Sequence, residues 1–177
     1  MIVTLVGYRG TGKSSLAPRI AQSLGYQPID SDRVIEQQEQ KTIAEIFAES
    51  GEAGFRQVEA RVMAELYDQD QLVVASGGGA ILNPITREKM RSAGPVFWLT
   101  AEPDEIVQRL QLDQSTPETR PSLTGLSPAE EVKTVLKKRE PIYREVAHFE
   151  IATMGQTIDQ IVEEILHQIS AWKGTES

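Results

Sequence analysis

The sequence of 177 residues contains no cysteine and only two histidines, His148 and His167. The absence of cysteine excludes disulfide bonds and thiolate metal sites, and it permits a reducing compartment. The two histidines lie far apart in unrelated contexts. Their separation argues against a histidine metal site or a histidine-based triad, and we expect both side chains to be surface or packing residues.

Positive charge and long apolar runs are also scarce. The chain has 18 Lys and Arg residues against 26 Asp and Glu residues, a formal net charge of −8, which disfavours a nucleic-acid partner. No apolar run approaches the length of a membrane span. The start, Met1-Ile2-Val3, leads directly into a predicted strand with no basic leader. We therefore expect a cytoplasmic protein that has no membrane partner.

The most informative stretch is residues 7–15, Gly-Tyr-Arg-Gly-Thr-Gly-Lys-Ser-Ser, which has the complete spacing G-x-x-x-x-G-K-[ST]. It follows the apolar run 2–6 and leads into a helical pattern over residues 13–24. Glycines allow backbone N–H groups to surround phosphate oxygens, and a helix N-terminus adds partial positive charge. Lys13 would reach the β- and γ-phosphates, and the Ser14 hydroxyl would bind Mg²⁺.

A structural glycine turn could match this spacing by chance. Strand, loop and helix nevertheless follow in the order that phosphate binding requires, so the sequence predicts a nucleoside triphosphate site. The predicted phosphate-binding residues are Gly10, Thr11, Gly12, Lys13, Ser14 and Ser15.

Short apolar segments alternate with helical patterns along the whole chain. The predicted strands cover residues 2–6, 27–30, 72–75, 95–99 and 148–152. This alternation predicts an α/β fold, a three-layer P-loop NTPase domain with a five-stranded parallel sheet flanked by helices, in one domain over residues 1–177. Residues 113–126 lack periodicity and are rich in turn formers, which predicts a mobile lid.

Residue types alone say less about which residues would bind Mg²⁺ and the acceptor of the phosphoryl group. The strand 72–75 ends without the Walker-B Asp of nucleotide hydrolases, and the nearest strand-end carboxylate is Asp30, followed by Asp32. One carboxylate would serve Mg²⁺ and the other would face an acceptor. The alternative is an Asx turn or helix N-cap. The spacing leaves both interpretations open.

Gly77, Gly78 and Gly79 follow the strand 72–75. Their N–H groups could bind an anion where a ligand approaches the backbone closely, although a plain loop-to-helix transition is the alternative. Arg56 and Arg139 lie on predicted helices. Arginines are usually solvated, and residue physics alone leaves open which of them point into a site.

Taken together, these segments resemble the shikimate kinases over nearly the full chain. The motifs that carry the resemblance are residues 7–15, Asp30-Ser31-Asp32, residues 43–59, Gly77-Gly78-Gly79, Arg120-Pro121 and residues 139–143. The resemblance implies transfer of the γ-phosphoryl group of ATP to the 3-hydroxyl of shikimate. The products would be shikimate 3-phosphate and ADP, in the chorismate pathway of aromatic amino acid biosynthesis.

The resemblance also implies roles on the acceptor side. Asp32 would bind ring hydroxyls and orient, or deprotonate, the attacking 3-hydroxyl. Arg56 and Arg139 would grip the shikimate carboxylate. Gly77, Gly78 and Gly79 would contact shikimate through their backbone.

On the nucleotide side, the resemblance implies that Ser14 and Asp30 hold Mg²⁺. Arg120, in the lid, would close over ATP and stabilise charge on the moving phosphoryl group. Gln156 would lie near the adenine, and the place of Arg109 relative to the adenine is left open. The implied catalytic residues are Lys13, Asp32 and Arg120, and we expect a monomer.

Two other kinds of protein share the loop. Gluconate kinases have the same fold but would not require the combination of Asp32, Arg56 and Arg139. Nucleoside monophosphate kinases also share the fold, and an acceptor assay distinguishes them. A regulatory protein that has lost catalysis is a different class, and the presence of Lys13, Asp30 and Asp32 argues against it.

Overall fold

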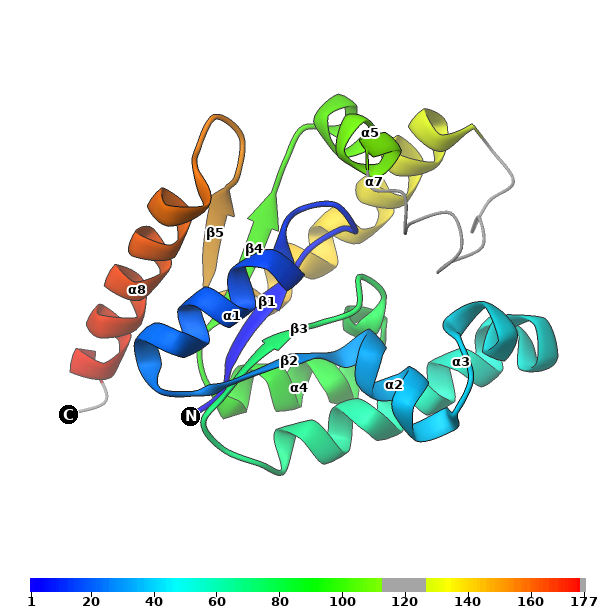
Figure 1. The fold of residues 1–177 in the computed structure, drawn as a ribbon, viewed down its shortest axis with the longest axis horizontal. Helices are drawn as coiled ribbons and strands as arrows, with labels where there is room; N and C mark the ends of the chain where they lie inside the picture. Colours follow the sequence, from blue (N-terminus) through cyan, green and yellow to red (C-terminus); the bar gives the residue numbers. More distant parts are fainter. Residues whose placement is uncertain (113–126, 176–177) are drawn as a thin grey trace.

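The computed structural model describes residues 1–112 and 127–175. Five parallel strands form one sheet in the order β2-β3-β1-β4-β5 (Figure 1). The strands are β1 (Val3–Val6), β2 (Gln27–Asp30), β3 (Leu72–Ala75), β4 (Val96–Thr100) and β5 (Phe149–Ala152). The helices are α1 (Lys13–Leu24), α2 (Ser31–Glu39), α3 (Ile43–Tyr67), η1 (Ala80–Leu82), α4 (Pro84–Ala93), α5 (Pro103–Leu112), α7 (Pro128–Val146) and α8 (Ile158–Thr175).

Two hydrophobic cores cover the two faces of this sheet. Val3 and Leu5 of β1 point to the face covered by α1 and α8, where they pack with Ile20 and Ile165. The neighbouring side chain Val6 points to the opposite face, which α3, α4 and α7 cover. This alternation has the period of two residues expected of a strand buried on both sides. The predicted three-layer α/β architecture is confirmed.

Local signals set most helix boundaries. Thr42 and Ser127 each form a capping box, at the starts of α3 and α7, and Asn83 caps α4. α1 ends at Leu24, as predicted, and Gly25 follows it in the left-handed conformation. α3 is broken at Gly51 (φ 66°, ψ −174°), which divides it into two segments. Strands β1 and β5 begin one residue later than predicted, and β4 begins and ends one residue later.

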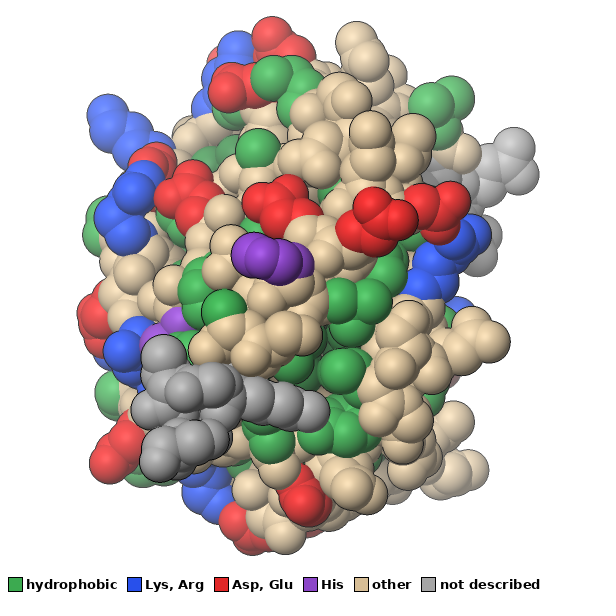
Figure 2. Space-filling view, turned by 90° about the vertical axis from the view of Figure 1, so that its left-hand side faces the viewer, with side chains coloured by type: hydrophobic (Ala, Val, Ile, Leu, Met, Phe, Trp, Pro, Cys, Tyr) green, Lys and Arg blue, Asp and Glu red, His purple; other side chains and the backbone are tan. Residues whose placement is uncertain are grey.

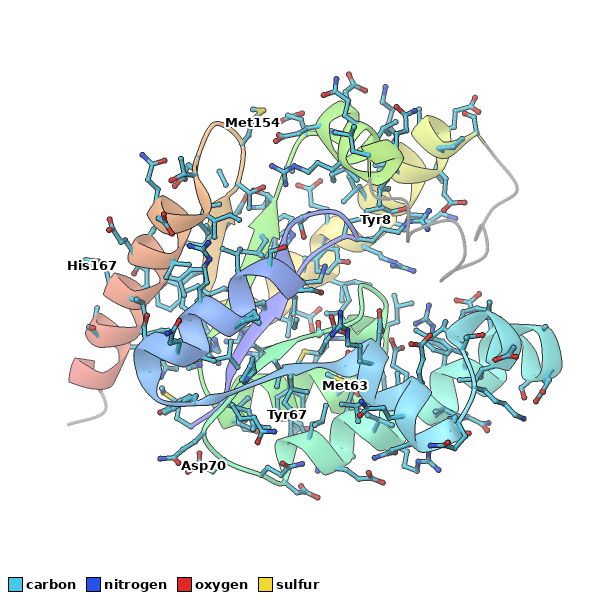
Figure 3. All side chains as sticks on the ribbon, viewed as in Figure 1. Tyr8, Met63, Tyr67, Asp70, Met154 and His167 are labelled. Atoms are coloured by element: carbon cyan, nitrogen blue, oxygen red, sulfur yellow. The ribbon has the colours of Figure 1, made fainter. Side chains whose placement is uncertain are left out.

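The side chains outside the site have the expected distribution. Met63 and Tyr67 are buried in the core beneath the sheet, whereas His167 lies on the exposed side of α8 (Figure 3). The ring of His148 packs at 4.5 Å from the ring of Trp172, so the predicted surface and packing roles of the histidines are confirmed. Acidic side chains are spread over the face that carries α8 (Figure 2). Among the described residues, no helix is both long and apolar enough to cross a bilayer.

The topology fixes where a ligand can bind. The chain leaves β1 into α1 on one face of the sheet, and it leaves β3 through η1 into α4 on the other face. Because β1 and β3 are neighbours, their two exits diverge and open a crevice beyond their carboxyl ends. The phosphate loop, the end of β2 and the glycine segment after β3 all lie at this edge.

Candidate active site

The loop between β1 and α1 is wrapped around the Lys13 ammonium group. Lys13 Nζ donates hydrogen bonds to the carbonyl oxygens of Gly7 and Tyr8, both at 2.8 Å, and the residue is only 8% exposed. Gly12, in the left-handed conformation at φ 94°, precedes α1 and supplies no capping side chain. The N-terminus of α1 therefore retains the partial positive charge that favours an anion.

A cleft of about 720 Å³ opens above this loop. The predicted phosphate-binding residues line it, and so do Asp30, Asp32, Gly77, Gly78 and Gln156. The structure thus gathers residues from the ends of three strands and from the segment after β5 around one cavity. Its size is in the usual range for small-molecule sites.

Asp30 joins the end of β2 to the phosphate loop. Its Oδ2 accepts a hydrogen bond from Ser14 Oγ at 2.6 Å, and its Oδ1 accepts one from the Asp32 backbone N–H at 3.1 Å. The second bond makes Asp30 the N-cap of α2. The N-cap interpretation is therefore confirmed, and it leaves Oδ2 beside Ser14, so the Mg²⁺ interpretation stays a prediction that the cap does not exclude. Asp32 is half-buried in the first turn of α2 and lines the cleft.

The oxygen atoms of Ser14 and Asp30 fit Mg²⁺ chemically. Mg²⁺ prefers oxygen ligands and is usually bound by one or two protein oxygens together with substrate phosphates and water. In residues 1–112 and 127–175, no three His, Asp or Glu side chains gather where they could hold a metal ion. A magnesium site at Ser14 and Asp30 would therefore be completed by nucleotide phosphates and water.

The glycine segment after β3 lies between two arginines from different helices. Arg139 of α7 donates from Nη1 to the Gly78 carbonyl oxygen at 3.1 Å. Arg56 of α3 lies so close to Gly79 that a Cβ there would be 2.2 Å from Arg56 Nη1. A Cβ on Gly78 would also lie 3.3 Å from the Gly7 carbonyl oxygen, so this segment contacts the phosphate loop. The structure thus brings Arg56, Arg139 and the glycines together.

Two carboxylates hold the Arg56 guanidinium group. Nη1 pairs with Glu59 Oε2 at 2.7 Å, and Nη2 pairs with Glu52 Oε1 at 3.2 Å. Glu59 is only 3% exposed, so its pair with Arg56 is largely shielded from water. Glu59 was not identified from the sequence, although the spacings of three and four residues on one helix are a usable signal for such pairs. A neighbouring cavity of about 560 Å³ is bordered by Arg56 and both glutamates.

A further ion pair ties the phosphate loop to α7. Arg9 Nη2 donates to Glu131 Oε1 at 2.8 Å, and Glu131 is only 1% exposed. Tyr8, the residue before Arg9, packs against Ile106 of α5 and Val132 of α7. Figure 3 labels Tyr8 below these two helices. Burial raises the pKa of the Tyr8 phenol, and the charge of Arg9 opposes that shift. No sequence pattern indicates this ion pair, because 122 positions separate its two residues.

At the far end of the cleft, Arg109 and Gln156 both line its wall. Arg109 Nη1 donates to the Gly10 carbonyl oxygen and to Thr153 Oγ1, both at 3.2 Å. Gln156 Nε2 donates to the Ala152 carbonyl oxygen at 2.9 Å. A contact between Gln156 and adenine remains a prediction. Arg120 and the predicted lid, residues 113–126, lie outside the described residues.

Comparison with known proteins identifies the family. The family model described as shikimate kinase matches residues 9–170. The chain belongs to the shikimate kinase family. It is therefore an ATP-dependent kinase of the transferase class, as the motifs predicted.

Individual shikimate kinases match nearly the whole chain. A shikimate kinase of Rhodopirellula baltica is 45% identical over 162 residues, which is 92% of this chain and 87% of that protein. One of Symbiobacterium thermophilum is 37% identical over 96% of each chain. The structure of the shikimate kinase of Acinetobacter baumannii in complex with shikimate has a TM-score of 0.89 and 36% identity, and covers 96% of this chain and 93% of its own. These matches favour the shikimate kinase prediction over the gluconate and nucleoside monophosphate kinase alternatives.

Proposed function

We propose that this cleft carries out the reaction of the family with the residues that the sequence singled out. The γ-phosphoryl group of ATP is transferred to the 3-hydroxyl of shikimate. A bond forms between the 3-oxygen and the γ-phosphorus as the bond to the β–γ bridging oxygen breaks, and ADP leaves with that oxygen. The observation that carries the proposal is the glycine segment between Arg56 and Arg139, in contact with the phosphate loop.

The nucleotide half is built from the phosphate loop. Backbone N–H groups from Gly10 to Ser15 bind the phosphates, and Lys13 exchanges its two carbonyl partners for β- and γ-phosphate oxygens. Ser14 and Asp30 hold Mg²⁺, which neutralises phosphate charge when it is bound. Gln156 lies on the adenine side of the cleft.

The acceptor half recognises a carboxylate and a set of hydroxyl groups. Arg56 and Arg139 present planar donors whose geometry matches a carboxylate, and the backbone of Gly77, Gly78 and Gly79 adds N–H donors. Asp32 binds ring hydroxyls and orients the 3-hydroxyl or takes its proton. Positioning and charge stabilisation supply most of the catalysis in such a transfer.

For Arg120 we propose the role that the family resemblance implies, stabilisation of charge on the transferred group. We also propose that the chain acts as a monomer in the cytoplasm without a nucleic-acid partner. The net charge of −8 and the absence of cysteine support the last two points. Size-exclusion chromatography with light scattering tests the monomer, and a mass of two chains would contradict it.

The test is a coupled ADP-release assay with Mg-ATP in which shikimate, gluconate and AMP are offered separately. We expect turnover with shikimate alone. Turnover with gluconate or AMP would overturn the acceptor assignment while leaving the nucleotide site intact. No turnover with any of the three would contradict the proposal as a whole and favour a protein that has lost catalysis.

A further inference from the structure

The Gly78 carbonyl oxygen receives two hydrogen bonds from α7. Tyr143 Oη donates at 2.7 Å, and Arg139 Nη1 donates at 3.1 Å. The two donors are four residues apart and thus share one face of the helix. We propose that Tyr143 is a positioning residue for the acceptor site, and that its hydroxyl fixes the orientation of the Gly78 peptide. This inference rests on the proposed acceptor site.

The two donors differ in how firmly they are held. Tyr143 is 0% exposed, and its ring stacks on Trp98 of β4 with a centroid distance of 5.8 Å and an interplanar angle of 14°. Tyr143 has only two side-chain torsions, and packing fixes both of them. Arg139 has a long side chain that lies at the edge of the glycine segment. When Arg139 turns to bind a carboxylate, Tyr143 remains as the donor that holds the Gly78 carbonyl.

The opposite side of the glycine segment has a second anchor. The Gly77 N–H donates to the hydroxyl oxygen of Ser31, which is buried, at 2.8 Å. In the described part of the chain, by contrast, no protein acceptor receives the N–H of Gly78 or Gly79. The segment is therefore fixed by Ser31 at the Gly77 N–H and by Tyr143 at the Gly78 carbonyl, and the N–H groups of Gly78 and Gly79 are left for a ligand.

Peptide geometry connects the Tyr143 hydroxyl to one of those donors. In a trans peptide the N–H of Gly79 points opposite to the C=O of Gly78. A carbonyl held toward α7 therefore directs the Gly79 N–H away from α7. Gly79 is also the residue that contacts the Arg56 guanidinium group. By holding the carbonyl, Tyr143 keeps this N–H beside the Arg56 guanidinium group, at the proposed carboxylate site.

The test is Tyr143→Phe, which keeps the ring and its stacking on Trp98 and removes only the hydroxyl. We expect the KM for shikimate to rise about tenfold, the scale of one lost hydrogen bond at a buried carbonyl, with the KM for ATP changed less than about twofold. The matched control is Tyr67→Phe. Tyr67 is also a buried tyrosine whose hydroxyl is hydrogen-bonded, to Thr4 Oγ1 at 2.9 Å, but it lies away from the cleft.

Thermal melts of both variants separate positioning from folding. We expect both to lose stability and only Tyr143→Phe to change the KM for shikimate. Equal kinetics for the two variants, a parallel change in both KM values, or loss of the fold in Tyr143→Phe would each overturn the inference. If the unchanged protein does not phosphorylate shikimate, the proposed function has failed. If it does, and Tyr143→Phe retains the normal KM, only this inference has failed.

Discussion

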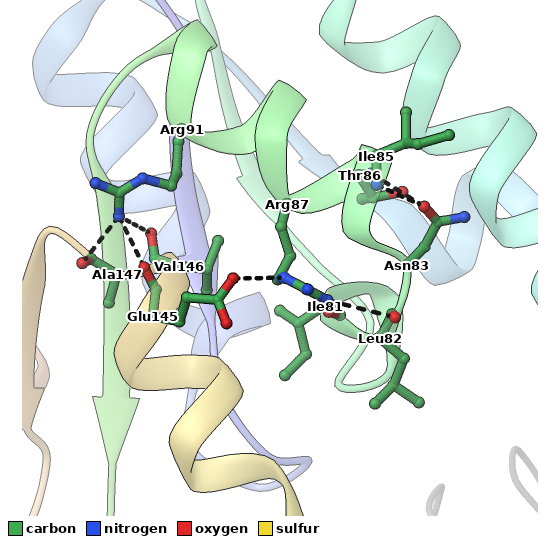
Figure 4. A network of polar contacts seen from close by, with 10 residues as sticks. All are labelled: Ile81, Leu82, Asn83, Ile85, Thr86, Arg87, Arg91, Glu145, Val146 and Ala147. Atoms are coloured by element: carbon green, nitrogen blue, oxygen red, sulfur yellow. Dashed lines mark hydrogen bonds and ion pairs between the residues drawn. The ribbon is translucent and has the colours of Figure 1, made fainter.

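Two arginines that bind backbone carbonyl oxygens lie at opposite ends of the same sheet. At the carboxyl end, Arg139 Nη1 donates to the Gly78 carbonyl beside the cleft. At the amino end, Arg91 Nη1 donates to the carbonyls of Glu145 at 2.9 Å and Val146 at 3.1 Å, in the last turn of α7 (Figure 4). Both residues are arginines on amphipathic helices, and both bind the main chain. Only their surroundings differ.

The two sites differ in whether the carbonyl oxygen has another hydrogen-bond donor when the arginine is absent. The last carbonyls of a helix have no partner within the helix, so Arg91 supplies donors that α7 itself lacks. The Gly78 carbonyl has a second donor in Tyr143, so Arg139 can leave it without exposing an unpaired group. An arginine that is needed for the fold stays in place. One whose partner has a substitute donor is available to bind a ligand.

Asp32→Asn should have the largest effect at the carboxyl end. We expect kcat with shikimate to fall at least about a hundredfold, the usual scale for a general base, while α2 keeps its N-cap Asp30. Asp70→Asn is the matched control at the amino end, where Asp70 pairs with the Met1 ammonium group. Steady-state kinetics at saturating Mg-ATP give the comparison. A near-normal kcat for Asp32→Asn would show that Asp32 has no catalytic role and is only a residue in the first turn of α2.

Arg139→Ala should act on shikimate binding. Removing one partner of a desolvated charge pair costs about 2 kcal/mol or more, so the KM for shikimate should rise at least about thirtyfold. The KM for ATP should hold, because the hydrogen bond of Arg139 is to the glycine segment. Arg144→Ala is the control on the same helix. Its pairs with Glu140 and Glu150 are exposed and contribute little. Equal shikimate KM values in the two variants would exclude Arg139 from the acceptor site.

Arg91→Ala should show the opposite pattern. Loss of its donors leaves these carbonyls of α7 to water, and we expect the free energy of unfolding to fall by about 0.5–1.5 kcal/mol. Urea denaturation measures this change. Both KM values should match those of the unchanged protein, since Arg91 is at the far end of the sheet. A rise in the shikimate KM comparable to that of Arg139→Ala would remove the distinction between the two ends.

Contiguous features of this molecule were predictable from the sequence. Strand β1, the phosphate loop and α1 form one uninterrupted segment, and their boundaries follow from local rules of periodicity and capping. The capping residues Thr42, Asn83 and Ser127 likewise act within three or four positions. The three-layer arrangement, a sheet with helices on both faces, was predictable from the alternation of strand and helix segments.

The acceptor half depends on contacts across the fold. Residue physics left open which arginines enter the site, because Arg91 and Arg139 differ only in what they meet in three dimensions. Arg56 and Arg139 were singled out by resemblance to the family. Tyr143 was missed because 65 positions separate it from Gly78, and a buried tyrosine gives no sign in sequence of where its hydroxyl points. Asp30 illustrates a third case, in which one predicted alternative, the helix N-cap, is confirmed, while the predicted Mg²⁺ role of the same carboxylate stays a prediction.

The smallest expected effect is a pH dependence of the free energy of unfolding, caused by His148 at the amino end of the sheet. His148 Nδ1 accepts the Val96 N–H at 3.1 Å, at the start of β4, so the bond requires a ring nitrogen without a proton. Burial lowers the pKa of His148, and the charge of Arg91 lowers it further. The unfolded chain therefore takes up this proton at a higher pH than the folded protein does. The free energy of unfolding should fall as the pH drops below about 6.5, toward the lower pKa of the folded state.

His148→Asn tests this by replacing the imidazole with an amide whose oxygen can still accept the Val96 N–H but does not titrate. Urea unfolding at several pH values between about 7 and 5 should give a shallower decline in this variant than in the unchanged protein. The half-buried ring limits the difference to less than about 1.4 kcal/mol per pH unit, the slope for one whole proton. Identical slopes would show that other groups set the acid stability. Because the histidine is remote from the cleft, the variant should also keep both KM values at pH 7, whereas a change in either would mean that the amino end of the sheet communicates with the site.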